Sequence, residues 1–152
     1  MIECDALVVG GGPAGSTTAA FLARRGRSVL LLERDHHPRF HIGESLLPID
    51  LPIFERLGVV LDYKDFIRKD GAEFIDERTG ATATFVFREG LEGTPKYAYQ
   101  VERSRFDHHL LKQAEATIDG FREERKMTSD IRAAREMVAQ GDEDDEHVAN
   151  AA

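Results

Sequence analysis

The chain has 152 residues, of which 41% are hydrophobic and 32% charged, and this size and balance predict one globular domain rather than two. Its formal net charge of -8 argues against a general affinity for nucleic-acid phosphates or for an anionic membrane surface. A run of five acidic residues at 142–146 carries most of that charge, so the acidity belongs mainly to the C-terminal end.

Cysteine content and hydropathy indicate the compartment. Cys4 is the single cysteine, so no intramolecular disulfide can form, which is typical of a reducing cytoplasm. The apolar stretches at 6–9 and 29–32 are far shorter than the roughly 18 residues that a membrane-spanning helix needs. The N-terminus also lacks the basic start and apolar run of a secretion signal. We therefore expect a cytoplasmic protein without a membrane anchor.

The first third of the chain predicts a strand, a glycine-rich turn, a helix and a second strand. Residues 6–9, Ala-Leu-Val-Val, are typical of a buried strand, and the turn at 10–15 follows at once. Pro13 suits the first helical turn, and Gly26 stands where a glycine ends a helix. The continuous apolar run within 28–33 indicates a parallel strand. This compact βαβ unit predicts an α/β fold of partial Rossmann-like type.

Shorter elements are expected after the βαβ unit. Ser104 with Asp107 three residues later resembles a capping box, so we expect a helix to start there. The other expected elements are a helix over 50–57, helical turns over 63–68, a hairpin of strands 72–76 and 81–87, a strand over 97–101 and an end of the Ser104 helix near 116.

The glycine-rich turn has the spacing of a phosphate-binding loop. Gly10 permits the tight turn, Gly12 lets the backbone approach a pyrophosphate, and Gly15 lets helix and strand pack closely. The helix N-terminus then offers unpaired N–H groups to the anion. Glu33, eighteen residues after Gly15, can accept both ribose hydroxyls of an adenosine and would repel a 2′-phosphate. The combination predicts dinucleotide binding over a purely structural turn, and it leaves NAD and FAD open.

The residues that follow resemble a known family. Glu33-Arg34 and the stretch 38–48, Pro-Arg-Phe-His-Ile-Gly-Glu-Ser-Leu-Leu-Pro, resemble the flavin-dependent halogenases and their relatives among FAD-dependent monooxygenases and geranylgeranyl reductases. The likeness runs from Asp5 to about Ala116. In halogenases that act on pyrroles and phenols, the loop commonly has this Gly-Glu-Ser-Leu-Leu-Pro form. The resemblance implies FAD as the cofactor.

The same resemblance implies a set of cofactor-binding residues. The stretch 100–107 resembles the family's strand-to-helix segment, in which Arg103 lies near FAD and could pair with the pyrophosphate or pack against the adenine. For Arg34, a plain surface charge is an equally good interpretation. The residues expected at the cofactor are Gly10, Gly12, Pro13, Ala14, Gly15, Glu33, Arg34, Glu44, Ser45 and Arg103.

One lysine is a catalytic candidate. The stretch 66–74, Phe-Ile-Arg-Lys-Asp-Gly-Ala-Glu-Phe, resembles the segment that carries the halogenases' active-site lysine, and Lys69 occupies that position. The resemblance implies that its ammonium meets hypohalous acid, made from halide, oxygen and reduced flavin. The alternative is a solvated lysine in a charged turn. No metal site is expected, because His36, His37 and His41 lack a cysteine or a helical histidine partner.

Later parts of the family pattern have no counterpart in this sequence. The family's further parallel strand, substrate-binding sheet and late Gly-Asp segment do not follow, and a chain without tryptophan cannot hold the Trp-x-Trp-x-Ile-Pro motif. We therefore expect a truncated or internally deleted member of marginal stability. The expected division is a partial FAD-binding domain at 1–116, a charged helix at 117–140 and an acidic disordered tail at 141–152.

The function expected first is that of an FAD-binding fragment of a halogenase-like oxidoreductase. The resemblance implies that the intact parent uses FADH2 and O2 to halogenate or oxygenate a small aromatic, free or tethered to a carrier protein, with a flavin reductase as supplier. Turnover by this chain alone is not expected. Two alternatives stay open: a non-enzymatic module that binds a partner through its C-terminal helix and tail, and a small NAD-binding protein. The loop at 44–48 argues against the latter.

Overall fold

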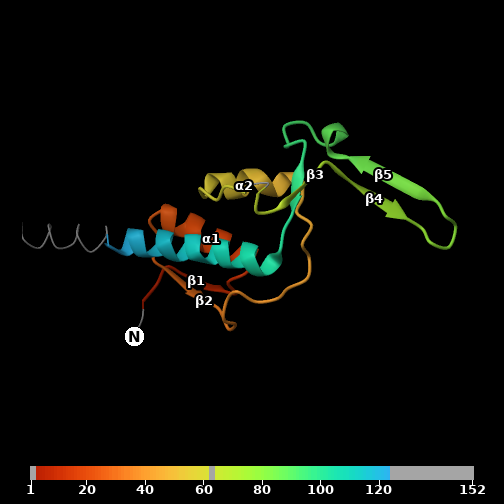
Figure 1. Ribbon diagram of the computed structural model, residues 1–152. Helices are drawn as coiled ribbons and strands as arrows, with labels where there is room; N and C mark the ends of the chain where they lie inside the picture. Colours follow the sequence, from red (N-terminus) through yellow and green to blue (C-terminus); the bar gives the residue numbers. More distant parts are fainter. Residues whose placement is uncertain (1–2, 62–63, 124–152) are drawn as a thin grey trace, which may run out of the picture.

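A computed structural model describes residues 3–61 and 64–123 (Figure 1). Its first part is the expected βαβ unit: β1 (Ala6–Val9), α1 (Pro13–Arg24) and β2 (Val29–Leu32). The two strands pair in parallel, from Ala6 opposite Val29 to Val9 opposite Leu32. Gly26 adopts a positive φ of 74° just beyond α1, so the glycine stop is confirmed. The predicted α/β fold with a partial Rossmann-like unit is thereby confirmed.

Among residues 3–61 and 64–123, only one face of this two-stranded sheet is covered. The unlabelled helix over residues 103–123 runs beside α1, and the sheet lies against this helix pair (Figure 1). Ala19 and Ala23 of α1, Val29 of β2 and Ile118 of the long helix form one buried cluster. The opposite face is open, because Leu7, Val9 and Leu32 are 57%, 77% and 47% exposed.

A second and larger cluster joins the long helix to the middle of the chain. The 3-10 turn η1 (Pro48–Asp50) leads into α2 (Leu51–Arg56), while β3 (Ile67–Lys69) pairs antiparallel with β6 (Ala98–Gln100). The rings of Phe54 and Phe106 meet edge to face at 5.2 Å between centroids. The buried members of the cluster are Ala20, Leu46, Leu51, Phe54, Leu57, Val59, Tyr99, Val101, Phe106, Leu110 and Ala114.

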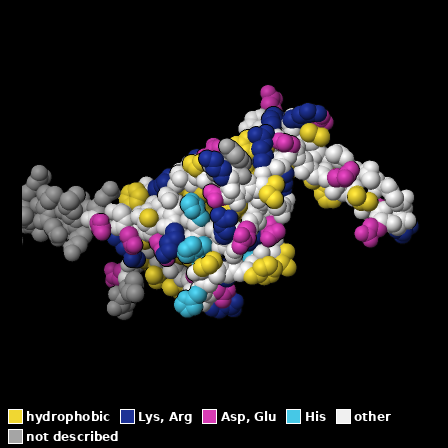
Figure 2. Space-filling model, viewed as in Figure 1, with side chains coloured by type: hydrophobic (Ala, Val, Ile, Leu, Met, Phe, Trp, Pro, Cys, Tyr) yellow, Lys and Arg dark blue, Asp and Glu magenta, His cyan; other side chains and the backbone are white. Residues whose placement is uncertain are grey.

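The hairpin β4 (Gly71–Ile75) and β5 (Thr82–Val86), followed by the 3-10 turn η2 (Phe87–Glu89), extends away from this body (Figures 1 and 2). The predicted hairpin is confirmed. Phe74 and Phe85 contact each other edge to face at 5.6 Å, yet both are about three-fifths exposed at 62% and 59%. The hairpin therefore buries little apolar surface of its own.

Three expectations about the later elements are wrong. Residues 67–69 form strand β3 and not the end of a helical turn, because they pair with β6. The helix over 103–123 does not end near 116: its backbone stays helical to residue 123, the Thr117 hydroxyl donates to the Gln113 carbonyl at 2.7 Å, and Ile118 packs in the core. Ser104 does not cap this helix, since its hydroxyl donates to the Glu102 carboxylate.

The division at 116 stays a prediction, and most of the expected charged helix and all of the expected acidic tail lie outside the described residues. Within the part of the chain that the structure describes, no helix combines the length and apolarity of a membrane span.

Candidate functional site

The glycine turn joins the carboxyl end of β1 to the start of α1. Gly10 has a positive φ of 105°, and its N–H donates to the Leu32 carbonyl at 2.7 Å. A Cβ on Gly15 would lie 1.8 Å from the carbonyl oxygen of Gly10, so no side chain fits there. Val8 of β1 lies 3.5 Å from the same position, so Gly15 allows the close packing of helix and strand that the sequence predicted.

Gly12 occupies the N-cap position of α1, and Pro13 starts the helix. Among the described residues, a Cβ on Gly12 would contact only the Arg39 guanidinium, at 3.6 Å, which is an ordinary van der Waals distance. The chain itself therefore leaves room for a side chain at this position.

Glu33 places a carboxylate directly beside the turn. Its Oε2 accepts a hydrogen bond from the Gly11 N–H at 2.6 Å, and its Oε1 accepts one from the Asp35 N–H at 2.8 Å. The backbone N–H of Asp35, followed by that of Gly11, lowers the pKa of Glu33 to about 2. The carboxylate is therefore ionised at neutral pH and fixed at the end of β2.

Two side chains that were not predicted as cofactor-binding residues lie next to Glu33. His37 Nε2 is 3.6 Å and Arg39 Nη2 is 4.0 Å from Glu33 Oε2. The His37 side chain is only 2% exposed, and its ring stacks on His108 of the long helix at 6.4 Å between centroids. Figure 2 shows basic, acidic and histidine side chains intermixed over the body of the molecule. The signal for Arg39 was present: it is a basic residue within the loop that follows Glu33.

The two arginines expected at the cofactor differ in position. The Arg34 side chain is 92% exposed and pairs with Asp35, so the structure does not bring it to the glycine turn. Arg103 is 12% exposed and bonds the buried carboxylate of Asp107 at 2.7 and 2.9 Å. It also donates to the carbonyl of Ile42 at 2.9 Å. Arg103 therefore anchors the loop that precedes Glu44.

Glu44 and Ser45 belong to an extra strand-like segment at the edge of β6. Val101 N–H donates to the Glu44 carbonyl at 2.8 Å, and Leu46 N–H donates to the Tyr99 carbonyl at 3.0 Å. These bonds hold the loop in one path between β2 and α2.

Lys69 meets this loop. It lies in β3, and its ammonium donates to the hydroxyl oxygen of Ser45. The ammonium is also 5.7 Å from the centroid of the Phe87 ring. Burial lowers the pKa of Lys69 from its usual value, while the nearby carboxylate of Asp50 opposes that change. Lys69 is thus a partly buried, partnered cation and not a solvated turn residue.

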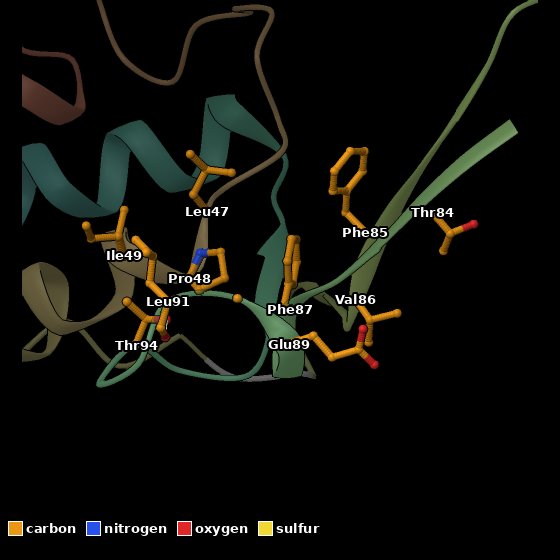
Figure 3. A pocket seen from close by; sticks show the side chains of 11 residues that line it. Leu47, Pro48, Ile49, Thr84, Phe85, Val86, Phe87, Glu89, Leu91 and Thr94 are labelled. Carbon is orange, nitrogen blue, oxygen red and sulfur yellow. Dashed lines mark hydrogen bonds between the residues drawn. The ribbon is translucent and has the colours of Figure 1, made fainter.

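An apolar groove of about 460 Å³ is lined in part by Phe87, the aromatic neighbour of this lysine (Figure 3). Leu47, Pro48 and Ile49 approach it from the segment that leads into α2, and Phe87 approaches it from η2 (Figure 3). Phe87 therefore contacts both the groove and the Lys69 ammonium. The complete lining is Leu47, Pro48, Ile49, Thr84, Phe85, Val86, Phe87, Glu89, Gly90, Leu91 and Thr94.

Metal ligation finds no support in the described part of the chain. Among residues 3–61 and 64–123, no group of three or more His, Cys, Asp or Glu side chains is arranged to hold an ion.

Comparison with known proteins identifies the family to which this chain is related. Residues 8–52 match the model of the NAD(P)-binding Rossmann-like domain. The flavin-dependent halogenase rdc2 of Metacordyceps chlamydosporia is 46% identical over 114 residues, which cover 74% of this chain and 20% of that protein. The myxobacterial chondrochloren halogenase CndH, an FAD-dependent halogenase of known structure, superposes with a TM-score of 0.63 at 44% identity over 73% of this chain and 26% of that one. The chain is homologous to the N-terminal part of the flavin-dependent halogenases.

The substrates of these halogenase relatives differ. A 1H-pyrrole-2-carbonyl-[peptidyl-carrier protein] chlorinase of Pseudomonas fluorescens is 32% identical, and a tryptophan 2-halogenase of Chondromyces crocatus is 42% identical. Identity to the tryptophan 2-halogenase is thus higher than identity to the pyrrole-carbonyl chlorinase. The chain spans between about a fifth and three tenths of the length of these relatives.

Proposed function

We propose that this chain binds the ADP half of FAD, as the N-terminal part of a halogenase-like flavoprotein. The observation that carries the proposal is the ionised carboxylate of Glu33, held by the Gly11 N–H at the carboxyl end of β2. This carboxylate is suited to accept the ribose hydroxyls, while the N-terminus of α1 receives the pyrophosphate. The room in front of Gly12 fits such a ligand.

The arginine side chains near the turn have different proposed roles in cofactor binding. Arg39, whose guanidinium lies beside Gly12 and is 18% exposed, is the arginine best placed to pair with the pyrophosphate. Arg103 already bonds Asp107 and two loop carbonyls, so it acts on the cofactor through the position of the loop. Pro13 and Ala14 contribute the first turn of α1. Arg34 has no contact in the described structure that supports a direct role.

Calorimetric titration with ADP, FAD, NAD and NADP tests this assignment. ADP is expected to bind nearly as well as FAD, because the matched residues serve adenosine and pyrophosphate, whereas NADP is repelled by Glu33. Gly12→Val removes the space for the pyrophosphate and should weaken ADP binding at least about tenfold, which corresponds to roughly 1.4 kcal/mol. Circular dichroism checks that the variant folds, as the open surroundings of Gly12 predict. Equal binding of ADP by parent and variant would refute the proposal.

In the intact protein, Lys69 is the proposed catalytic residue. When bound, reduced FAD would supply hypohalous acid from oxygen and halide, and the Lys69 ammonium would donate a hydrogen bond to that oxidant. The substrate class is a small aromatic, free or carrier-tethered as the name of the Pseudomonas relative states, and a flavin reductase supplies reduced FAD in the cytoplasm. The apolar groove lined in part by Phe87, the aromatic neighbour of Lys69, suits an aromatic ring.

We expect no halogenation by this chain alone, because most of the length of its relatives has no counterpart in it. Incubation with a pyrrole or phenol, reduced FAD, oxygen and chloride, followed by mass spectrometry, tests this expectation. Chlorinated product from the parent and none from Lys69→Ala would establish Lys69 as catalytic and contradict the expectation of an inactive fragment.

A further inference from the structure

The backbone on both sides of Ser45 is fixed. Ser45 faces Gln100 of β6 in an antiparallel bridge. The residues on either side, Glu44 and Leu46, exchange backbone hydrogen bonds with Val101 and Tyr99 at 2.8 and 3.0 Å. Ser45 thus sits on a rigid element and not on a free loop.

Lys69 reaches Ser45 from a different strand. It pairs with Ala98 of β6 within the β3–β6 ladder, and its ammonium donates to the hydroxyl of Ser45. The face of the Phe87 ring covers the same ammonium. In the described chain, the ammonium therefore has one hydroxyl acceptor and one aromatic neighbour, with Asp50 as the carboxylate that acts on it.

We propose that Ser45 is a positioning residue for Lys69: the hydroxyl oxygen of Ser45 holds the Lys69 ammonium near Phe87, which lines the apolar groove. An ammonium has three N–H donors, so a bond to Ser45 fixes the directions of the other two. Leu47, two residues after Ser45, and Phe87, whose ring centroid is 5.7 Å from the Lys69 ammonium, both line the groove. The proposal deepens the proposed function of Lys69, but the bond needs no bound nucleotide.

The inference gives Ser45 a different role from the cofactor contact that the family resemblance implies. A hydroxyl that accepts from an ammonium stabilises the charged form of the lysine. Ser45→Ala removes that acceptor and leaves Phe87 and the partial burial in place. Ser45→Thr keeps a hydroxyl at the same position. Ser104→Ala is a matched control, because it also removes a serine hydroxyl, but one that donates to Glu102 and does not bond Lys69.

Nuclear magnetic resonance of the lysine side chains, recorded against pH without nucleotide, tests the proposal. The Lys69 signal is assigned by its loss in Lys69→Arg. In Ser45→Ala, Lys69 should titrate at a lower pH than in the parent, and its acetylation by limiting acetic anhydride at fixed pH should be several-fold faster. Ser45→Thr and Ser104→Ala should match the parent. An unchanged Lys69 titration and labelling rate in Ser45→Ala would overturn the proposal.

ADP and FAD titrations of the same variants separate this proposal from the proposed function. Failure of the parent to bind ADP would refute the nucleotide site and leave the Ser45 result standing. Weaker FAD binding by Ser45→Ala, together with an unchanged Lys69 titration, would show Ser45 as a direct cofactor contact and overturn the positioning role.

Discussion

The guanidinium of Arg103 and the carboxylate of Asp107 form two hydrogen bonds, at 2.7 and 2.9 Å, one turn apart on the long helix. Asp107 is fully buried, and Arg39 approaches the same carboxylate at 3.8 Å. Arg103 further donates to the carbonyls of Ile42 and Gly43. The pair thus connects the long helix to the loop that carries Glu44 and Ser45.

Arg103→Ala should lower the free energy of unfolding by about 3 kcal/mol, because the buried carboxylate of Asp107 loses its hydrogen-bonded cation and keeps only Arg39 nearby. Urea unfolding followed by circular dichroism measures the change. Arg105→Ala is the matched control: Arg105 pairs with Asp65, but both side chains are about half exposed, so the cost should be about 0.5 kcal/mol or less. Similar losses in the two variants would contradict the anchoring role of Arg103.

Gly15→Ala should destabilise the βαβ unit strongly, by about 3 kcal/mol, since the added Cβ would overlap the Gly10 carbonyl oxygen. Gly120→Ala is the control within the long helix, where an added Cβ meets nothing within 4 Å. That variant should be more stable than the parent by up to about 1 kcal/mol. Thermal or urea unfolding measures the change in unfolding free energy of each variant, and the two changes should have opposite signs. An unchanged unfolding free energy for Gly15→Ala would show that the turn relaxes around the added Cβ.

The βαβ unit could be predicted because its signals are local. Strand, glycine turn, helix and the carboxylate of Glu33 follow one another within about thirty residues, and each has its own residue pattern. Strand β3 could not be predicted in this way: Ile67 to Lys69 are extended because they pair with Ala98 to Gln100, some thirty residues later. Tertiary pairing decided the conformation of a segment whose own composition fits a helical turn.

The site shows the same division between local and long-range information. Gly10, Gly12 and Gly15 share one turn, and the parallel pairing of β1 with β2 brings Glu33 beside it. His37 and Arg39 reach Glu33 only through the path of the loop after β2, which Arg103 fixes from the long helix. The sequence shows that Arg39 is a basic residue in the loop after Glu33, but spacing carries no information on the path of that loop. The contacts of His37 and Arg39 with Glu33 and the Lys69 to Ser45 bond therefore emerged only from the structure.

Acid should weaken the native state through Glu33. Its folded-state pKa of about 2 lies below the ordinary value of 4.5, so its contribution is complete above about pH 4.5 and is lost as the pH falls through about 2. Glu33→Gln should therefore be less stable than the parent at pH 7, and the difference should shrink as the pH falls below 4.5. Urea unfolding at several pH values measures it, with the exposed Glu89→Gln as the control. A pH-independent difference would contradict the assignment.

The open face of the β1–β2 sheet should tolerate a polar side chain that the covered face does not. Val9 in β1 is 77% exposed, whereas Val29 in β2 is 2% exposed and packs against Ala19 and Ile118. Threonine matches valine in shape and in β-propensity, so a Val→Thr pair isolates the cost of burying a hydroxyl. Val9→Thr should change the unfolding free energy by no more than about 0.5 kcal/mol, and Val29→Thr should lower it by about 1 to 3 kcal/mol. Urea unfolding of the two variants tests the difference, and a large loss for Val9→Thr would mean that this face is covered in solution.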